Sequence, residues 1–112
     1  MNEINLKRKE SQAHQIVADI LANGIKNANV VDPIVMDVVL SSDLSHLKVF
    51  VNLSGNQNKG IEALNNAAGY VRSILAKRLD WRKVPQIVFK IDDVSANGFK
   101  IDEILRKLNS EN

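Results

Sequence analysis

The chain has 112 residues, 45% of them hydrophobic and 25% charged, which is the composition of a folded domain rather than of a disordered segment. It contains no cysteine, and this excludes disulfides, a thiolate nucleophile and every metal centre built on cysteine. No apolar run approaches the ~18 residues of a membrane span, and the first ten residues lack the apolar stretch of a signal peptide. We therefore expect one cytoplasmic domain over residues 1–112, with its core at about residues 5–108 and no membrane contact.

The net charge of +2 hides an uneven distribution along the chain. Between Arg72 and Lys90 there are six basic residues and one acid, Asp80. A smaller basic block lies at residues 7–9, and from Asp92 onward the acids outnumber the bases. Local blocks of charge steer partners more strongly than the sum does.

The first half of the chain predicts a helix and a hairpin. Apolar residues recur at helical spacing over residues 5–23, and Gly24 is expected to end this helix by adopting the left-handed conformation. Residues 34–41 are rich in β-branched side chains, and residues 46–53 alternate apolar and polar positions. With the polar turn between them, these two runs predict an antiparallel hairpin, followed by a polar loop at residues 54–60.

The second half begins with the strongest helical pattern, over residues 61–79. Residues 65–69, Asn-Asn-Ala-Ala-Gly, are mostly weak helix formers, so a kink is expected near Ala67, Ala68 and Gly69. Residues 80–85 form a basic loop, residues 86–91 a third strand, and residues 99–108 a short amphipathic closing helix. The order of elements predicts an α+β fold, with helices packed on a three-stranded sheet.

The ordered set of motifs resembles a known family. Val38-Val39-Leu40-Ser41-Ser42-Asp43-Leu44-Ser45-His46-Leu47-Lys48-Val49-Phe50-Val51 is similar to its hairpin, and Leu64-Asn65-Asn66-Ala67-Ala68-Gly69-Tyr70-Val71-Arg72-Ser73 to its helix–kink–helix motif. Arg78-Leu79, Val84-Pro85 and Gly98 followed by Ile101-Asp102-Glu103-Ile104-Leu105 come in the expected order. Over about 100 of the 112 residues, the chain resembles bacterial ribosome-binding factor A.

This resemblance implies a single type II KH-like domain in which the kink at residues 67–69 replaces the usual Gly-x-x-Gly loop. It also implies a ribosome assembly factor that binds the immature small (30S) subunit near the ends of its 16S rRNA during late maturation and rRNA processing, above all in the cold. Such a protein acts without catalysis or cofactor, as a monomer, and in functional interplay with ribosome-assembly GTPases.

The basic residues are the candidate RNA contacts, because guanidinium and ammonium groups bind the phosphate groups of the RNA backbone. Five of them are the first choice: Arg72, Lys77, Arg78, Arg82 and Lys83. Five more complete the set: Lys7, Arg8, Lys9, Lys48 and Lys90. The alternative is that these charged side chains bind no partner and form an ordinary solvent-exposed helix face and loop.

The aromatic residues and the kink each have two interpretations. Trp81 and Phe50 offer faces for base stacking, although a packing role is commoner for tryptophan, and Tyr70 is expected to pack. Gly69 either lets the backbone approach RNA closely or only permits tight packing of the helix on the sheet.

Little in the sequence indicates catalysis. His14 and His46 belong to different elements and lack the spacing of metal ligands, so no metal site is expected. Asp92 and Asp93 are adjacent, which on a strand would point them to opposite faces. The alternative to RNA binding is a small protein-interaction module, or a homodimer formed through the exposed edge of the hairpin.

Overall fold

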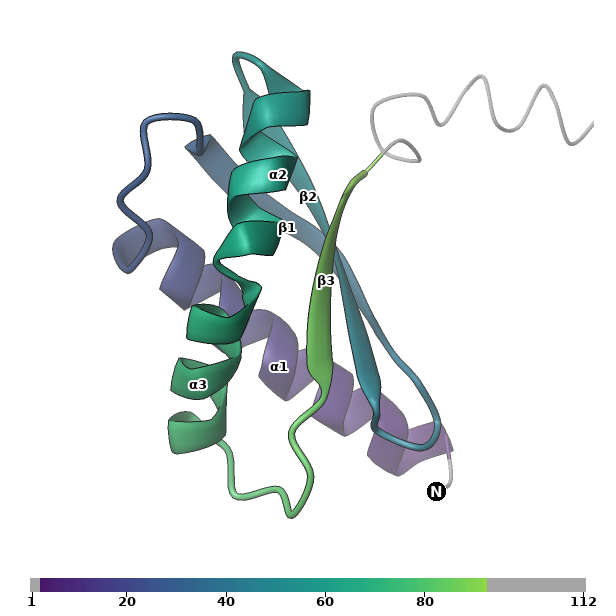
Figure 1. Ribbon diagram of the computed structural model, residues 1–112. Helices are drawn as coiled ribbons and strands as arrows, with labels where there is room; N and C mark the ends of the chain where they lie inside the picture. Colours follow the sequence, from purple (N-terminus) through teal and green to yellow (C-terminus); the bar gives the residue numbers. More distant parts are fainter. Residues whose placement is uncertain (1–2, 93–112) are drawn as a thin grey trace, which may run out of the picture.

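The computed structural model describes residues 3–92. Figure 1 shows the elements in chain order: α1 (Glu3–Asn23), β1 (Val31–Leu40), β2 (His46–Ser54), α2 (Gln57–Asn66), α3 (Ala68–Arg78) and β3 (Gln86–Ile91). The predicted hairpin, the broken helix and the third strand are all present, each within a few residues of its predicted bounds. The predicted closing helix at residues 99–108, the residues that link it to β3 and the acidic end lie outside the described residues.

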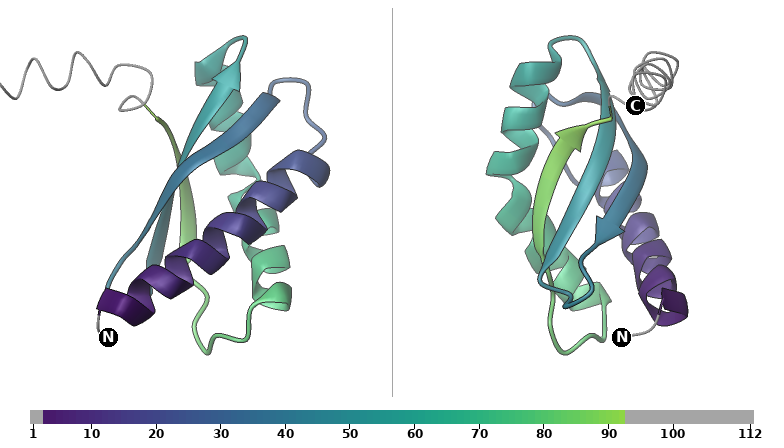
Figure 2. Two further views of the ribbon diagram at one scale, coloured as in Figure 1. Left: turned by 180° about the vertical axis from the view of Figure 1, so that it is seen from behind. Right: turned by 90° about the vertical axis from the view of Figure 1, so that its right-hand side faces the viewer.

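The strands form one sheet in the order β1-β2-β3. β1 and β2 are antiparallel, whereas β2 and β3 are parallel, because α2 and α3 carry the chain back across the sheet before β3 begins. All three helices lie against the same face of this sheet, and the other face is open in the described part of the chain (Figure 2). This is the α+β, type II KH-like arrangement that the sequence resemblance implies.

The central strand β2 decides which face is buried. Leu47, Val49 and Val51 are completely buried against the helices, and Leu53 is nearly so. Lys48, between them, is exposed on the opposite face. Because successive side chains of a strand point to opposite faces, the alternation predicted for residues 46–53 produces a sheet with one dry side and one wet side.

A β-bulge in β1 keeps a charge out of the core. Val35 pairs with Val51, but the next pair joins Asp37 to Phe50, so β1 has one extra residue at this point. The shift leaves Asp37 exposed, and Val38 is buried after it. An uninterrupted alternation would have directed the carboxylate inward, where an unpaired charge is very unfavourable.

Two helix ends differ in detail from the sequence prediction. α2 begins at Gln57 rather than at residue 61, because the side chain of Asn56 accepts a hydrogen bond from the backbone N–H of Lys59 and caps the helix at 3.1 Å. α1 ends at Asn23 as predicted, but Gly24 is not left-handed; among the described glycines only Gly55 has a positive φ, of 74°. A Cβ on Gly24 would lie 2.9 Å from the carbonyl oxygen of Ile20, so close contact explains this glycine.

Asn65 fastens α2 to the outer edge of β3. Its side-chain amide donates to the carbonyl of Phe89 at 3.0 Å and accepts from the N–H of the same residue at 2.8 Å. The amide group therefore takes the place of a neighbouring strand at this position of the sheet edge. This asparagine is a poor helix former by intrinsic propensity, yet its position in α2 is explained by this pair of hydrogen bonds.

We predict that Asn65→Ala lowers the free energy of unfolding by about 1–3 kcal/mol, because two partly buried backbone groups of Phe89 lose their partners. Asn66→Ala is the matched control, since Asn66 is exposed and forms no such pair. Urea denaturation of both variants measures the difference. Equal stability of the two variants would contradict the role assigned to Asn65.

Candidate nucleic-acid interface

Two basic segments far apart in the sequence meet at one end of the molecule. Residues 7–9 lie on the first turns of α1, and Arg82 and Lys83 lie on the loop between α3 and β3. In Figures 1 and 2 this loop, the β1–β2 turn and the start of α1 all lie at the lower end. We call this surface the basic end and define it by five residues: Lys7, Arg8, Lys9, Arg82 and Lys83.

Trp81 holds the two segments of the basic end together. Its indole N–H donates to the side-chain oxygen of Gln12 at 3.3 Å, and the ammonium of Lys9 lies 4.6 Å from the centre of the ring. The ring is half-buried and packs against the hydrophobic core. Trp81 thus anchors the loop to α1, as the packing interpretation predicts, and its Lys9 side is not free for a base.

The β1–β2 turn beside the basic end is held by one carboxylate. Asp43 accepts hydrogen bonds from the hydroxyls of Ser45 at 2.6 Å and Ser41 at 2.7 Å, and from the N–H of Ser45 at 3.1 Å. These bonds, chiefly that from the Ser45 hydroxyl, lower the pKa of Asp43, and the positive charge of Lys83 lowers it further. The backbone N–H of Gln86 donates to the carbonyl of Ser45 at 2.9 Å and ties the turn to the basic loop.

Because the folded pKa of Asp43 is depressed, its contribution to stability is present at neutral pH and is lost as the pH falls below the ordinary value of 3.8. We predict that Asp43→Asn is less stable than the parent at pH 7 and that the difference shrinks toward pH 2. Urea midpoints measured across this range test the sign. A difference that stays constant with pH would show that the charge of Asp43 is not involved.

Two of the first-choice arginines have partners within the protein. Arg78 pairs with Asp19 of α1 at 2.7 Å, and the guanidinium of Arg72 donates to the carbonyl of Val84 at 2.9 Å. Lys77 and Arg78 also occupy the last turn of α3, where positive charge complements the helix dipole. Their structural roles make these residues weaker candidates for RNA contact than Arg82 and Lys83, which are exposed and lie on the loop of the basic end.

The predicted kink is present as an interruption of one residue, Ala67, between α2 and α3. Ala67 has φ −92° and ψ 2°, and its N–H is shared between the carbonyls of Ala63 and Leu64. A Cβ added to Gly69 would meet no atom within 4 Å, so the proposal that this glycine permits close packing of helix on sheet is wrong. Beside it lies an open hollow of about 270 Å³, lined by Ala68, Gly69, Arg72, Gln86 and Ile87.

Tyr70, next to this glycine, is 52% exposed, which does not agree with the packing role expected for it. Its ring is therefore available at the break between the helices. Stacking on such a ring is a common way in which proteins hold an unpaired RNA base.

We predict that Gly69→Ala leaves the free energy of unfolding unchanged or raises it by less than about 1 kcal/mol, because alanine favours the helix and the space is open. Gly60→Ala is the contrasting variant. Its Cβ would lie 2.6 Å from a side-chain carbon of Leu53 and 2.8 Å from the carbonyl oxygen of Asn29. We expect this crowding to cost about 1–3 kcal/mol. Urea denaturation compares the two, and a loss of stability in Gly69→Ala would contradict the open space at the kink.

Lys48 and Lys90 are not part of the basic end. Both are exposed on the open face of the sheet, where Lys90 is paired in register with Phe50. Phe50 itself is half-buried. The ten predicted contacts are thus divided among the basic end, α3 and the open sheet face.

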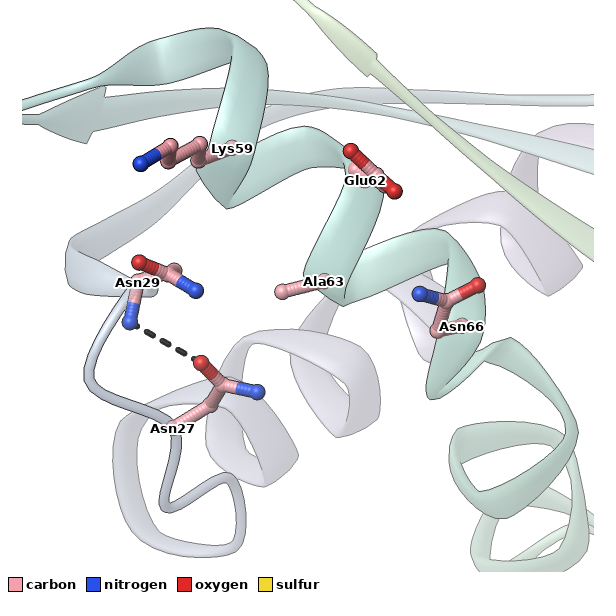
Figure 3. Close-up of a pocket in the computed structure, with 6 residues that line it drawn as sticks. All are labelled: Asn27, Asn29, Lys59, Glu62, Ala63 and Asn66. Atoms are coloured by element: carbon pink, nitrogen blue, oxygen red, sulfur yellow. Dashed lines mark hydrogen bonds between the residues drawn. The ribbon is translucent and has the colours of Figure 1, made fainter.

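A second hollow, of about 340 Å³, lies at the opposite end, between the α1–β1 loop and α2 (Figure 3). Three asparagines line it, and the side chain of Asn27 accepts from the N–H of Asn29 at 2.9 Å. Lys59 and Glu62 supply one charge of each sign. This balance gives the hollow no net attraction for phosphate, in contrast to the basic end.

The sequence model of the family "Ribosome-binding factor A" matches residues 5–105. A ribosome-binding factor A of Mycoplasmopsis agalactiae is 48% identical over 108 residues, which cover 96% of each chain. This chain belongs to the ribosome-binding factor A family.

Solved structures of the family agree with the fold. The crystal structure of ribosome-binding factor A from Thermus thermophilus aligns with a TM-score of 0.74 at 24% identity, covering 77% of this chain and 93% of that one. A Thermus thermophilus homology model fitted into the cryo-electron microscopy map of a 30S complex aligns with a TM-score of 0.68 at 26% identity, covering 77% of this chain and 93% of that one.

The two histidines and the Asp92/Asp93 pair were considered in the sequence as possible catalytic or metal-binding groups, and the structure places three of these four residues. The ring of His14 contacts the carbonyl of Val35 at 3.3 Å, and that of His46 contacts the Ser45 hydroxyl at 2.8 Å. Asp92 is buried, and Asp93 lies outside the described residues. Within residues 3–92 no three His, Asp or Glu side chains are grouped to hold a metal ion, and no helix is long and apolar enough to cross a membrane.

Sequence reasoning missed two features of this region. The exposure of Tyr70 has a local signal that the prediction overlooked, since this residue lies off the apolar stripe that contains Val71 and Leu75. The partners of Arg78 and Arg72 were missed as well, because Asp19 lies 59 residues from Arg78 in the chain. Only the tertiary fold brings these groups together.

Proposed function

We propose that the chain is a ribosome assembly factor that binds the immature small ribosomal subunit through its 16S rRNA, with the basic end as the principal contact. It acts during late maturation and rRNA processing, most importantly in the cold, as a cytoplasmic monomer that works alongside assembly GTPases. The proposal extends to this chain the partner named for the Thermus thermophilus protein in its 30S complex.

The observation that carries the proposal is the meeting of two basic segments at one end. Arg82 and Lys83 are exposed, and their loop is fixed to α1 by Trp81 rather than left to move freely. A rigid group of cations reads the spacing of phosphates better than the same charges on a flexible tail, because less conformational entropy is lost on binding.

The break between α2 and α3 supplies a second contact in this proposal. Its hollow is lined by Gly69, Arg72 and Gln86, and Tyr70, the next residue of the chain after Gly69, is exposed. A nucleotide that stacks on Tyr70 would place its phosphate near the backbone of Gly69. The KH-like fold thus retains an RNA contact at the position where the Gly-x-x-Gly loop is replaced.

The proposed mechanism is a shift of equilibrium and makes or breaks no covalent bond. By binding one arrangement of an rRNA element more tightly than its alternatives, the protein raises the population of that arrangement. The size of the shift depends only on the difference between the two affinities. Such assistance matters more in the cold, where misfolded RNA helices rearrange slowly.

The test is co-sedimentation of the protein with free small subunits at several salt concentrations. We expect Arg82→Glu with Lys83→Glu to weaken binding at least about ten-fold and to flatten the salt dependence by roughly two counterions. The matched control is Lys26→Glu with Lys59→Glu, which changes the net charge equally on exposed residues at the opposite end. This control should retain most of the affinity.

The outcomes separate the alternatives. If both double variants lose the same affinity for small subunits, binding depends on net charge alone and the basic end is not a specific contact. Binding that ignores salt and both variants would favour an apolar interface, as expected of a protein-interaction module or a homodimer. Circular dichroism of each variant confirms that the fold is intact.

A further inference from the structure

Lys48 and Lys90 lie apart from the basic end, on the face of the sheet that is open in the described part of the chain (Figure 2). They surround one aromatic ring. Phe50 of β2 is paired in register with Lys90 of β3, and Lys48 comes two residues before Phe50 on the same strand. Because side chains two residues apart in a strand point to the same face, all three share the open face. Both lysines are exposed, and Phe50 is half-buried.

The two lysines are not used by the protein itself. Among residues 3–92, neither Lys48 nor Lys90 has an ion-pair or hydrogen-bond partner, whereas Arg78 is paired with Asp19. The Cα atoms of the two lysines are about 8 Å apart, because they are separated by one strand spacing and by two residues along the strand. Two cations at this separation suit an anion that repeats along a chain, such as the phosphates of a polynucleotide.

The charged residues of the sheet are separated by strand. Both acids, Asp32 and Asp37, belong to β1, whereas the two bases belong to β2 and β3. Asp37 is paired in register with Phe50 on the side opposite Lys90, and its carboxylate accepts a hydrogen bond from the N–H of Val38 at 2.9 Å. Negative charge on β1 repels phosphate, so an anionic strand bound to this face lies over β2 and β3.

Each outer edge of the sheet is occupied by a helix side chain at one position. The carboxylate of Glu10 on α1 accepts a hydrogen bond from the N–H of Leu40 on β1 at 2.8 Å. On β3, the amide of Asn65 pairs with both backbone groups of Phe89. Side chains in these places compete with the hydrogen bonds that an added strand would form. A partner of the sheet therefore has better access to the open face than to the edges, which disfavours a peptide or a second copy that pairs as a strand.

We propose that Lys48, Phe50, Val88 and Lys90 form a binding site for single-stranded RNA, which we call the Phe50 site. One unpaired base stacks on the ring of Phe50, and the two ammonium groups bind phosphates beside it. Val88 is 38% exposed and pairs in register with Lys48, so it offers an apolar contact to the same nucleotide. A base inside a duplex has no free face for the ring, so the site selects unpaired RNA without reading its sequence. The choice of RNA as the ligand rests on the proposed function, whereas the site itself is separate from the basic end.

The test measures binding of the full chain to a fluorescently labelled oligouridine and to an RNA duplex of the same length. Phe50→Leu should weaken binding of the oligouridine at least about five-fold, because stacking is lost while an apolar side chain remains on the sheet. Its affinity for the duplex should not change. Lys48→Gln with Lys90→Gln should lower the slope of the salt dependence for the oligouridine by about 1.4, as expected for the loss of two phosphate contacts to a single strand.

Two other double variants remove the same net charge and are the matched controls. Arg82→Gln with Lys83→Gln changes the basic end, and Lys26→Gln with Lys59→Gln changes exposed residues at the opposite end. Both should lose less affinity for the oligouridine than the variant of Lys48 and Lys90. Circular dichroism of each variant checks that the fold is intact.

Several results would overturn the Phe50 site. Phe50→Leu could bind the oligouridine as tightly as the parent, or lose equal affinity for oligouridine and duplex. A loss confined to the variant of Arg82 and Lys83 would assign the oligouridine to the basic end instead. A measurement without substitutions is nuclear magnetic resonance, in which the oligouridine should shift the amide signals of residues 48–50 and 88–90. Shifts confined to residues 7–9 and 82–83 would contradict the site. The proposed function is tested separately by co-sedimentation with small subunits, so the two proposals fail by different results.

Discussion

The structure depends on one constraint, the alternation of side chains along β2. Leu47, Val49 and Val51 must all face one way, so a single layer of helices removes them from water. That layer lies entirely on one side of the sheet, and the loops that join helices to strands lie at the two ends of the sheet. The open face of the sheet follows from this one-sided burial, and the basic end lies at the end of the sheet where the α3–β3 loop meets the start of α1.

Features of the fold that depend on neighbouring residues in the chain could be predicted from the sequence, whereas those that depend on distant residues could not. The alternation in β2, the helical stripe and the weak helix formers at residues 65–69 are local, and the elements they predict are present with nearly the predicted bounds. The bulge at Asp37 and the hydrogen bonds from Asn65 to Phe89 depend on the register between strands and on a contact 24 residues away. No local period encodes them, which is why Asn65 appears in the sequence only as a poor helix former.

The same limit applies to charge. Along the chain, residues 72–90 are a single basic block, but the fold divides it: Arg78 pairs with α1, Arg72 with the loop carbonyl of Val84, and Lys90 lies on the open face. In return, the fold joins Arg82 and Lys83 to residues 7–9 through Trp81. The distribution of charge on the surface is therefore a property of the tertiary structure. A block of basic residues in the sequence shows which residues can contribute to a basic surface, but not which of them lie together in it.

The break between α2 and α3 shows how a local weakness is stabilised from outside. In a helix, glycine costs about 1 kcal/mol relative to alanine and asparagine up to about 0.7 kcal/mol. Asn65 offsets this cost with two hydrogen bonds to the edge of β3, each worth roughly 0.5–1.5 kcal/mol. The position of the break is thereby tied to the sheet rather than to the helix itself. Gly69 and Tyr70, just beyond it, are consequently held on a fixed frame while remaining exposed to solvent, and the proposed RNA contact at the kink uses this frame.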